Sequence, residues 1–176
     1  PKGKRIELSK QLLSRVAKLH LNRISHLDLG LHSVWFQEPG QVKISHFMSA
    51  AIPDQETLGA SRYQFLSVAK TPEEVMGVES SRRKKDVFLL GLLVHKLLFG
   101  KLPDADEYGL VEWSETKLES SDCEEFHSWF EIALAHEPKK RFHSAVEALE
   151  KFAEATEPVS WHTENLKDLE SFKDPE

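Results

Sequence analysis

The chain contains a single cysteine, Cys123, among its 176 residues, so an internal disulfide is excluded. Its longest apolar run, Val87 to Val94, is far shorter than the roughly 20 apolar residues that a membrane-spanning helix needs. An excess of basic residues is also missing, because 23 Lys and Arg stand against 29 Asp and Glu, and the formal net charge is −6. These absences argue against a disulfide-rich fold, a membrane role and nucleic-acid binding.

What is present indicates one globular domain. The chain is 40% hydrophobic and 30% charged, and a domain of this length buries roughly 70% of the surface that its unfolded chain exposes. The lone cysteine and the lack of a secretory signal favour a reducing, cytoplasmic location. Because the sequence opens with Pro1 in place of Met, we expect a piece of a longer protein.

The first half of the chain predicts a helix, a hairpin and a loop. Apolar residues recur at helical spacing between Glu7 and Asn22, which predicts an amphipathic helix. Two short extended runs, Val34 to Phe36 and Val42 to Ile44, flank Glu38-Pro39-Gly40, a sequence typical of a hairpin turn. Residues 45–71 are polar and mixed, and they predict a long surface loop with little regular structure.

The second half predicts a series of helices. Thr71-Pro72 indicates a helix start, and Asp86 to Phe99 is apolar on almost all sides, as expected of a helix in the middle of a core that ends at Gly100. The basic run Arg82 to Lys85 is interpreted as a solvated approach to that helix, with an anion-binding or localisation patch as the alternative. Further helical patterns cover Cys123 to Ala135 and Ser144 to Ala155, and a polar tail either forms a helix near Glu164 to Phe172 or stays loose. The four tryptophans are predicted to be core or packing residues: Trp35, Trp113, Trp129 and Trp161.

The polar segment after the first helix carries the most informative pattern. His26-Leu27-Asp28 is followed by Ser33 and, after the second strand, by His46-Phe47-Met48. These segments resemble the H-R-D-L-x-x-x-N catalytic loop and the D-F-G motif of protein kinases. Further segments resemble kinase signatures in the same order along the chain: Val42-Lys43-Ile44 (V-K-I), Thr71-Pro72-Glu73 (A-P-E), Asp86-Val87-Phe88 (D-V-W), Leu98-Phe99-Gly100 (the L-x-T-G region) and His136 to Phe142 (D-P-x-K-R-P).

The resemblance implies a fold that is mainly α with a small β-hairpin, the C-terminal lobe of a Ser/Thr protein kinase. It covers residues 5–155, and residues 156–176 are left as a C-terminal tail or short helix. In the family the A-P-E glutamate pairs with a late arginine, here Glu73 with Arg141, and the aspartate at Asp86 hydrogen-bonds the backbone of the catalytic loop. His26 is expected to pack and to bond backbone, as this residue does in kinases.

The alignment of this chain with the A-P-E motif has two possible registers. Leu58 to Tyr63 resembles the G-T-x-x-Y segment that lies just upstream of A-P-E, which would move the glutamate position near Ser67. The distance between Glu73 and Asp86 fits the family better, so we expect Glu73 to be the paired residue.

The residues that carry kinase chemistry differ from the family pattern. Magnesium prefers oxygen ligands, but a histidine, His46, stands at the D-F-G aspartate and Ser33 stands at the asparagine. Gly30 stands where the family has a lysine that helps to neutralise the transferred phosphate. Leu27 stands where the family has an arginine that pairs with a phosphorylated loop. No glycine-rich phosphate loop and no V-A-I-K lysine occur in the 176 residues.

Asp28 is the one candidate catalytic residue, either as a surviving base or as a residue that only shapes the loop. No cofactor-binding or metal-binding residue is predicted. The alternative is a transition-metal site made from four nearby residues, which imidazole and carboxylate would suit but which no H-E-x-x-H pair supports: His26, Asp28, His32 and His46.

The sequence therefore predicts a catalytically impaired, pseudokinase-like module that acts as a protein-interaction or regulatory scaffold within a larger protein and needs no cofactor. Its expected partner is another protein or an upstream part of the same protein. The alternative is an active or weakly active Ser/Thr protein kinase whose N-terminal lobe lies outside this chain and which uses ATP and magnesium. A helical adaptor unrelated to kinases would require the ordered motifs to coincide by chance.

Overall fold

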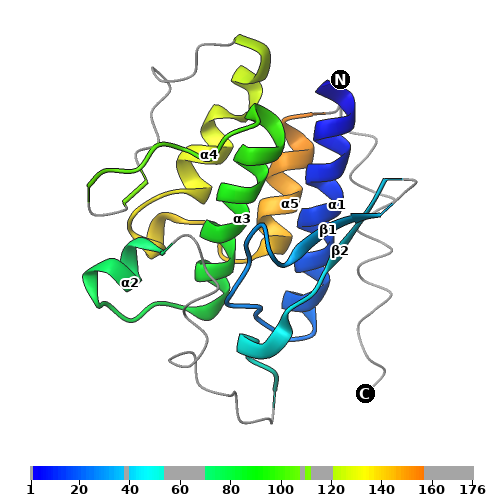
Figure 1. The fold of residues 1–176 in the computed structure, drawn as a ribbon. Coiled ribbons are helices and arrows are strands. Elements are labelled where there is room, and N and C mark those ends of the chain that lie inside the picture. Colours follow the sequence, from blue (N-terminus) through cyan, green and yellow to red (C-terminus); the bar gives the residue numbers. More distant parts are fainter. Residues whose placement is uncertain (1, 38–39, 54–69, 108–109, 112–120, 157–176) are drawn as a thin grey trace.

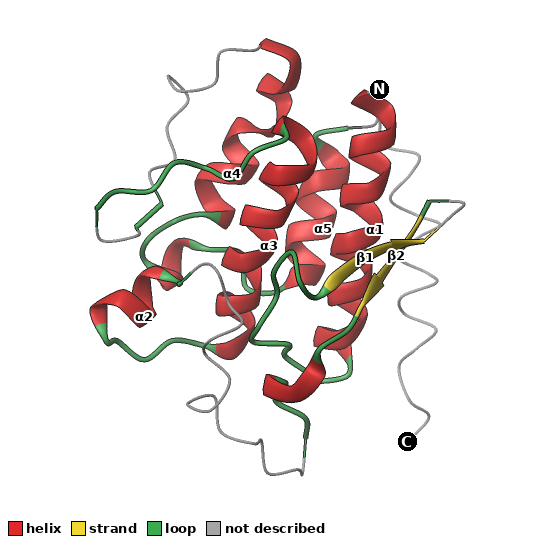
Figure 2. Cartoon of the chain, in the orientation of Figure 1, coloured by secondary structure: helices red, strands yellow, loops and turns green. Residues whose placement is uncertain are grey.

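A computed structural model describes residues 2–37, 40–53, 70–107, 110–111 and 121–156. The described chain is mainly helical, with one two-stranded antiparallel sheet (Figures 1 and 2). In chain order the elements are α1 (Lys2–Leu21), β1 (Val34–Gln37), β2 (Gln41–Ile44), the 3-10 turn η1 (Phe47–Ser49), α2 (Pro72–Met76), α3 (Arg82–Phe99), η4 (Ser121–Phe126), α4 (His127–Ala133), η5 (Pro138–Lys140) and α5 (Ala145–Glu154). In the described residues no helix is both long and apolar enough to cross a membrane.

Helix α1 confirms the predicted first helix but begins at Lys2, earlier than Glu7. Its core side carries Leu12, Leu13, Val16 and Ala17, all fully buried, at the spacing of one helical face. The last turn holds Lys18 and His20, where positive charge suits the negative end of the helix dipole. Helix α5 packs along α1 and runs in the opposite direction (Figure 1).

Helix α3 lies at the centre of the helical layer, as its apolar sequence predicts (Figure 1). Its buried residues run from Asp86 to His95, with Leu98 beyond them. The interpretation of Arg82 to Lys85 as an approach to the helix was wrong, because the helix already begins at Arg82, where the carbonyl of Ser81 accepts hydrogen bonds from Lys84 N and Lys85 N. Gly100 ends it with a positive φ of 79°, a conformation in which glycine has no Cβ to clash.

Strands β1 and β2 form the predicted hairpin, with Val34 opposite Ile44 and Phe36 opposite Val42. Val42 is buried, but β1 faces outward and leaves Trp35 57% and Phe36 53% exposed. The prediction that Trp35 is a core or packing residue was therefore wrong. Trp35 pairs with the exposed Lys43 across the hairpin, on the face opposite to that of the buried Val42. Its indole N–H donates to Ser45 Oγ at 2.6 Å.

The last helices close the core around aromatic side chains. Phe126 stacks on Phe152 at a centroid distance of 4.6 Å. Trp129 is 3% exposed and its Nε1 donates to the Ala148 carbonyl at 2.7 Å, so its predicted core position is confirmed. The predicted helix from Cys123 to Ala135 divides into η4 and α4. The other two tryptophans and the proposed tail helix lie outside the described residues: Trp113, Trp161 and 164–172.

The predicted loop at residues 45–71 contains more structure than expected in its described part. Residues 47–49 form η1, and Ala51 exchanges two backbone hydrogen bonds with Ser25, at 3.0 and 2.8 Å. Residues 54–69, which include the alternative segment Leu58 to Tyr63, lie outside the described residues. After them, Thr71 and Glu74 form a capping box at the start of α2, which confirms the predicted helix start.

Candidate functional site

The loop between α1 and β1 is held by the carboxylate of Asp86, which is fully buried on α3. Asp86 Oδ2 accepts from His26 N and Oδ1 accepts from Leu27 N, both at 2.7 Å. These bonds confirm the expectation that Asp86 binds the backbone of this loop. Charge-assisted bonds of this kind are short and strong, so α3 fixes the loop to the core.

A third donor to Asp86 was not predicted. His20 Nδ1 accepts from the backbone N–H of Ala145 at 3.0 Å, which leaves its Nε2–H to donate to Asp86 Oδ2 at 3.0 Å. One buried imidazole thus links the end of α1 to the carboxylate on α3 and to the start of α5. The sequence contained no signal for this link, because residues 20, 86 and 145 are far apart in the chain.

Leu27 has a positive φ of 66°, which costs a residue with a Cβ about 1–3 kcal/mol. The conformation persists because Asp86 binds the two successive amides at His26 and Leu27. The loop is therefore a strained segment held in place by its surroundings.

His26 is fully buried. Its Nε2–H donates to the Ser45 carbonyl at 2.8 Å, and its Nδ1 lies 3.3 Å from the Asp28 amide. Burial lowers the pKa of His26, against the opposing effect of the Ser45 carbonyl, so the neutral ring is favoured. The expectation that His26 packs and bonds backbone is confirmed.

The carboxylate of Asp28 is in contact with the imidazole ring of His32. The carboxylate is 7% exposed, and its Oδ2 is 3.3 Å from His32 Nε2. The ring also occupies the space above Gly30, since a Cβ at residue 30 would lie 2.7 Å from His32 Cε1. Any larger side chain at residue 30 would therefore displace His32 from Asp28, a dependence that the sequence alone does not reveal.

Ser33 is buried and uses its hydroxyl to close the loop. Its Oγ donates to the Gly30 carbonyl and accepts from the Gly30 amide, both at 3.0 Å. This oxygen is already engaged within the loop, which leaves it little capacity to bind a cation.

His46 lies across from His32, with ring centroids 5.7 Å apart in an edge-on arrangement. It is exposed, has a positive φ of 63°, and its Nδ1 is 2.8 Å from Ser45 Oγ. The structure thus brings Asp28, His32 and His46 into one neighbourhood. Within the described ranges, however, no group of three or more His, Cys, Asp or Glu side chains is arranged to hold a metal ion, so the transition-metal alternative gains no support.

The predicted pair between Glu73 and Arg141 is confirmed. Arg141 donates two parallel bonds to the Glu73 carboxylate, at 2.9 and 2.7 Å, and both side chains are almost completely buried. Burial alone would raise the pKa of Glu73, but the hydrogen bonds and charge of Arg141 hold that pKa below its usual value.

Arg141 also binds three backbone carbonyls and lies 4.6 Å from the centre of the Phe88 ring. The carbonyls belong to Ala135, His136 and Lys84. One guanidinium therefore joins α2, α3 and the turn after α4. Its planar group of N–H donors has a fixed geometry that reaches an acceptor in each of these segments.

Several large apolar side chains near the Asp28 loop and on β1 are exposed. Large side chains there are between 40% and 57% exposed: Leu31, Trp35, Phe36, Phe47 and Met48.

Several known Ser/Thr protein kinases are similar to this chain. The serine/threonine-protein kinase PrkC of Bacillus subtilis is 27% identical over 99 residues, which cover 56% of this chain and 15% of the kinase. The CBL-interacting serine/threonine-protein kinase 5 of Arabidopsis thaliana is 33% identical over 122 residues, 68% of this chain and 27% of the kinase. A probable serine/threonine-protein kinase KIN1 homolog of Encephalitozoon cuniculi is 31% identical over 113 residues, 64% of this chain and 19% of the kinase.

These similarities support a protein kinase-like relationship. The chain spans well under a third of the length of each of these three relatives. No protein-family model matches it.

Proposed function

We propose that this chain is the C-terminal lobe of a kinase-like module, residues 5–155, whose catalytic motifs are degenerate and which acts as a protein-interaction or regulatory scaffold within a larger protein. The observation that carries the proposal is a contrast between two sets of residues. The pairs that build the scaffold, Glu73 with Arg141 and Asp86 with the loop backbone, are complete. The residues at the kinase chemical positions are engaged in other contacts.

The donor set does not fit magnesium. Magnesium requires hard oxygen ligands in near-octahedral geometry, but Ser33 Oγ is bonded to Gly30 and residue 46 offers an imidazole. Asp28 offers carboxylate oxygens, but its Oδ2 is paired with His32 Nε2. Asp28, Ser33 and His46 therefore do not together supply the oxygen ligands that magnesium-dependent phosphoryl transfer requires.

The exposed apolar side chains near the loop and on β1 support a binding role. Trp35 and Phe36 present two aromatic rings to solvent, and aromatic side chains are enriched in protein interfaces. The occupant of this surface is a protein partner or an upstream part of the same protein, and no nucleic acid or membrane is required.

The test is the melting temperature of the chain with and without ATP and magnesium. A ligand at 100 times its dissociation constant stabilises a protein by about 2.7 kcal/mol, which would raise the melting temperature of a domain of this size by several degrees. We expect no magnesium-dependent shift. The same comparison on the longest natural chain that contains these residues extends the test to any upstream lobe.

The opposite result would favour the alternative, an active or weakly active Ser/Thr kinase. The observation in its favour is that Asp28, the position of the catalytic base, is retained and buried. A magnesium-dependent shift accompanied by phosphotransfer that is lost in Asp28→Asn would overturn the scaffold proposal.

A further inference from the structure

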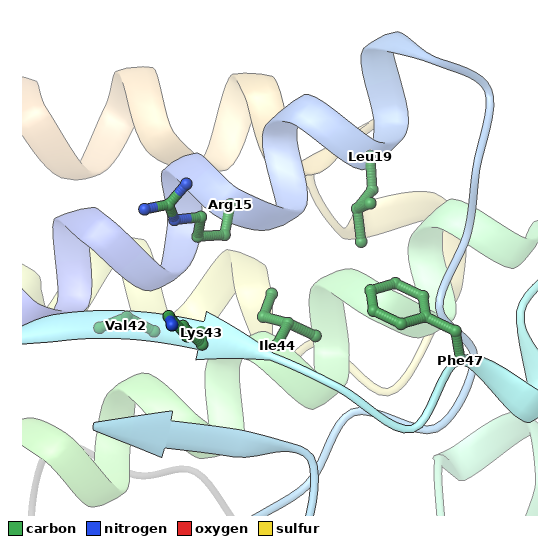
Figure 3. Close-up of a pocket in the computed structure, with 6 residues that line it drawn as sticks. All are labelled: Arg15, Leu19, Val42, Lys43, Ile44 and Phe47. Carbon is green, nitrogen blue, oxygen red and sulfur yellow. The ribbon is translucent and has the colours of Figure 1, made fainter. Parts of the chain in front are cut away.

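A groove runs between α1 and the segment β2–η1. Its volume is about 310 Å³, and it is lined by six residues: Arg15, Leu19, Val42, Lys43, Ile44 and Phe47. Figure 3 shows Leu19, Ile44 and Phe47 pointing toward one another, with Arg15 further along α1. The groove does not include Asp28 or His32, but it shares Phe47 with the exposed apolar side chains beside the Asp28 loop. The inference below rests on the lining of the groove and not on the proposed function.

The lining combines an apolar floor with two basic side chains. Val42 is fully buried, Phe47 is 40% exposed, and Arg15 and Lys43 are exposed. A groove of this kind fits a segment that carries apolar side chains next to carboxylates, because the apolar groups leave water while the charges stay paired at its rim.

We propose that residues 157–176 of this same chain occupy the groove. The segment contains six acidic residues and two lysines, a net charge of −4, whereas α1 contains six Lys and Arg and one Glu, a net charge of +5. The charges of the segment and the helix are thus complementary.

The apolar residues of the segment have a matching pattern. Leu166, Leu169 and Phe172 recur every third residue, which places them on one side of a helix. Acidic residues flank them at Glu164, Asp168 and Glu170. An amphipathic helix of this composition presents apolar side chains to the floor of the groove and carboxylates to Arg15 and Lys43.

The connection is long enough. The start of α5 lies at the end of α1, where Ala145 N bonds His20, and α5 then runs back along α1 (Figure 1). The groove lies in the second half of α1, at Arg15 and Leu19. Twenty residues span about 30 Å even when fully helical, which is the length of the whole of α1.

The experiment uses the full chain and follows the methyl signals of Leu19, Val42 and Ile44 by NMR. The variant Leu166→Ser with Leu169→Ser and Phe172→Ser removes the apolar side of the segment. We expect these three groove residues to shift, while the methyl signals of Leu89 and Leu90 in α3 remain unchanged and show that the fold is intact. The matched control, Thr163→Ser with Asn165→Ser and Ser171→Ala, changes three polar residues of the same segment and should leave the groove signals in place.

A second variant tests the charges. Arg15→Glu with Lys43→Glu should reproduce the shifts at Val42 and Ile44 that the apolar variant causes, because it reverses the two charges that attract the acidic segment. Both side chains are exposed, so their replacement does not disturb the core. Groove signals that are insensitive to both variants would overturn the proposal. Shifts that depend on protein concentration would also overturn it, because they would identify a second copy of the chain as the occupant.

Discussion

Arg141 joins α2, α3 and the turn after α4 through buried hydrogen bonds, and replacing it should destabilise the protein strongly. Arg141→Ala leaves Glu73 as an unpaired buried carboxylate, which typically costs about 3–5 kcal/mol. Arg141→Lys should recover only a small part, because an ammonium cannot donate the two parallel bonds to Glu73 and the further bonds to Ala135 and His136. Urea denaturation of the three proteins measures the difference.

The neighbouring Lys140 serves as the control. It pairs with Glu137 at 2.7 Å, but both side chains are about two-thirds exposed, and exposed pairs contribute little. Lys140→Ala should therefore leave the unfolding free energy nearly unchanged. Equal effects of Lys140→Ala and Arg141→Ala would show that the buried pair with Glu73 is not important for stability.

At the scale of secondary-structure elements, α3 approaches the end of α4 closely at Gly91. A Cβ on Gly91 would lie 2.7 Å from Leu134 Cδ2 and 3.3 Å from Ala133 Cβ. Gly91→Ala should lower the unfolding free energy by about 1–3 kcal/mol through overpacking, in spite of the roughly 1 kcal/mol that alanine gains over glycine in a helix. Thermal denaturation is a suitable measurement.

The same substitution in α1 provides the matched control. A Cβ on Gly3 would have no atom within 4 Å, so Gly3→Ala should be neutral or slightly stabilising. Shortening Leu134 to Ala in the Gly91→Ala background should restore part of the lost stability, because the added methyl then fills space that the leucine vacated. If Gly91→Ala behaves like Gly3→Ala, the helices do not approach as closely as described.

The elements themselves could be predicted because each has a local signal. The apolar run of α3, the Thr71-Pro72 start of α2 and the turn between β1 and β2 depend on neighbours in sequence. The exposure of Trp35 could not be predicted, because it depends on what packs against β1 and not on the residue type. The start of α3 at Arg82 was also missed, since four charged residues in a row lack the apolar periodicity that marks a helix.

The candidate site was predictable to the extent that its residues are fixed by the scaffold. Asp86, His26, Glu73 and Arg141 make the contacts that the kinase resemblance implied. The position of His32 between Asp28 and Gly30 was not predictable, because it depends on the absence of one Cβ in three-dimensional space.

At the scale of the whole molecule, stability should depend on pH through two buried histidines, His26 and His95. Burial lowers the pKa of both in the folded protein, so at mildly acidic pH the unfolded chain binds more protons than the folded one. Under that condition the unfolding free energy decreases as pH decreases. We therefore expect it to fall from pH 7.5 to pH 5, with the loss beginning near the unfolded histidine pKa of about 6.5.

Urea denaturation at half-unit pH intervals measures this dependence. Keeping the pH at 5 or above limits the contribution of Glu73 and Glu74, whose pKa values are lowered in the folded protein, because the stability that they provide is lost only as the pH approaches and falls below the unfolded glutamate pKa of about 4.3. His95 Nδ1 donates to the Lys101 carbonyl at 2.7 Å, a bond that a glutamine amide can replace without titrating. His95→Gln should therefore make the unfolding free energy change less between pH 7.5 and pH 5. A wild-type free energy that stays constant over this range would show that neither buried ring has to remain neutral for the protein to fold.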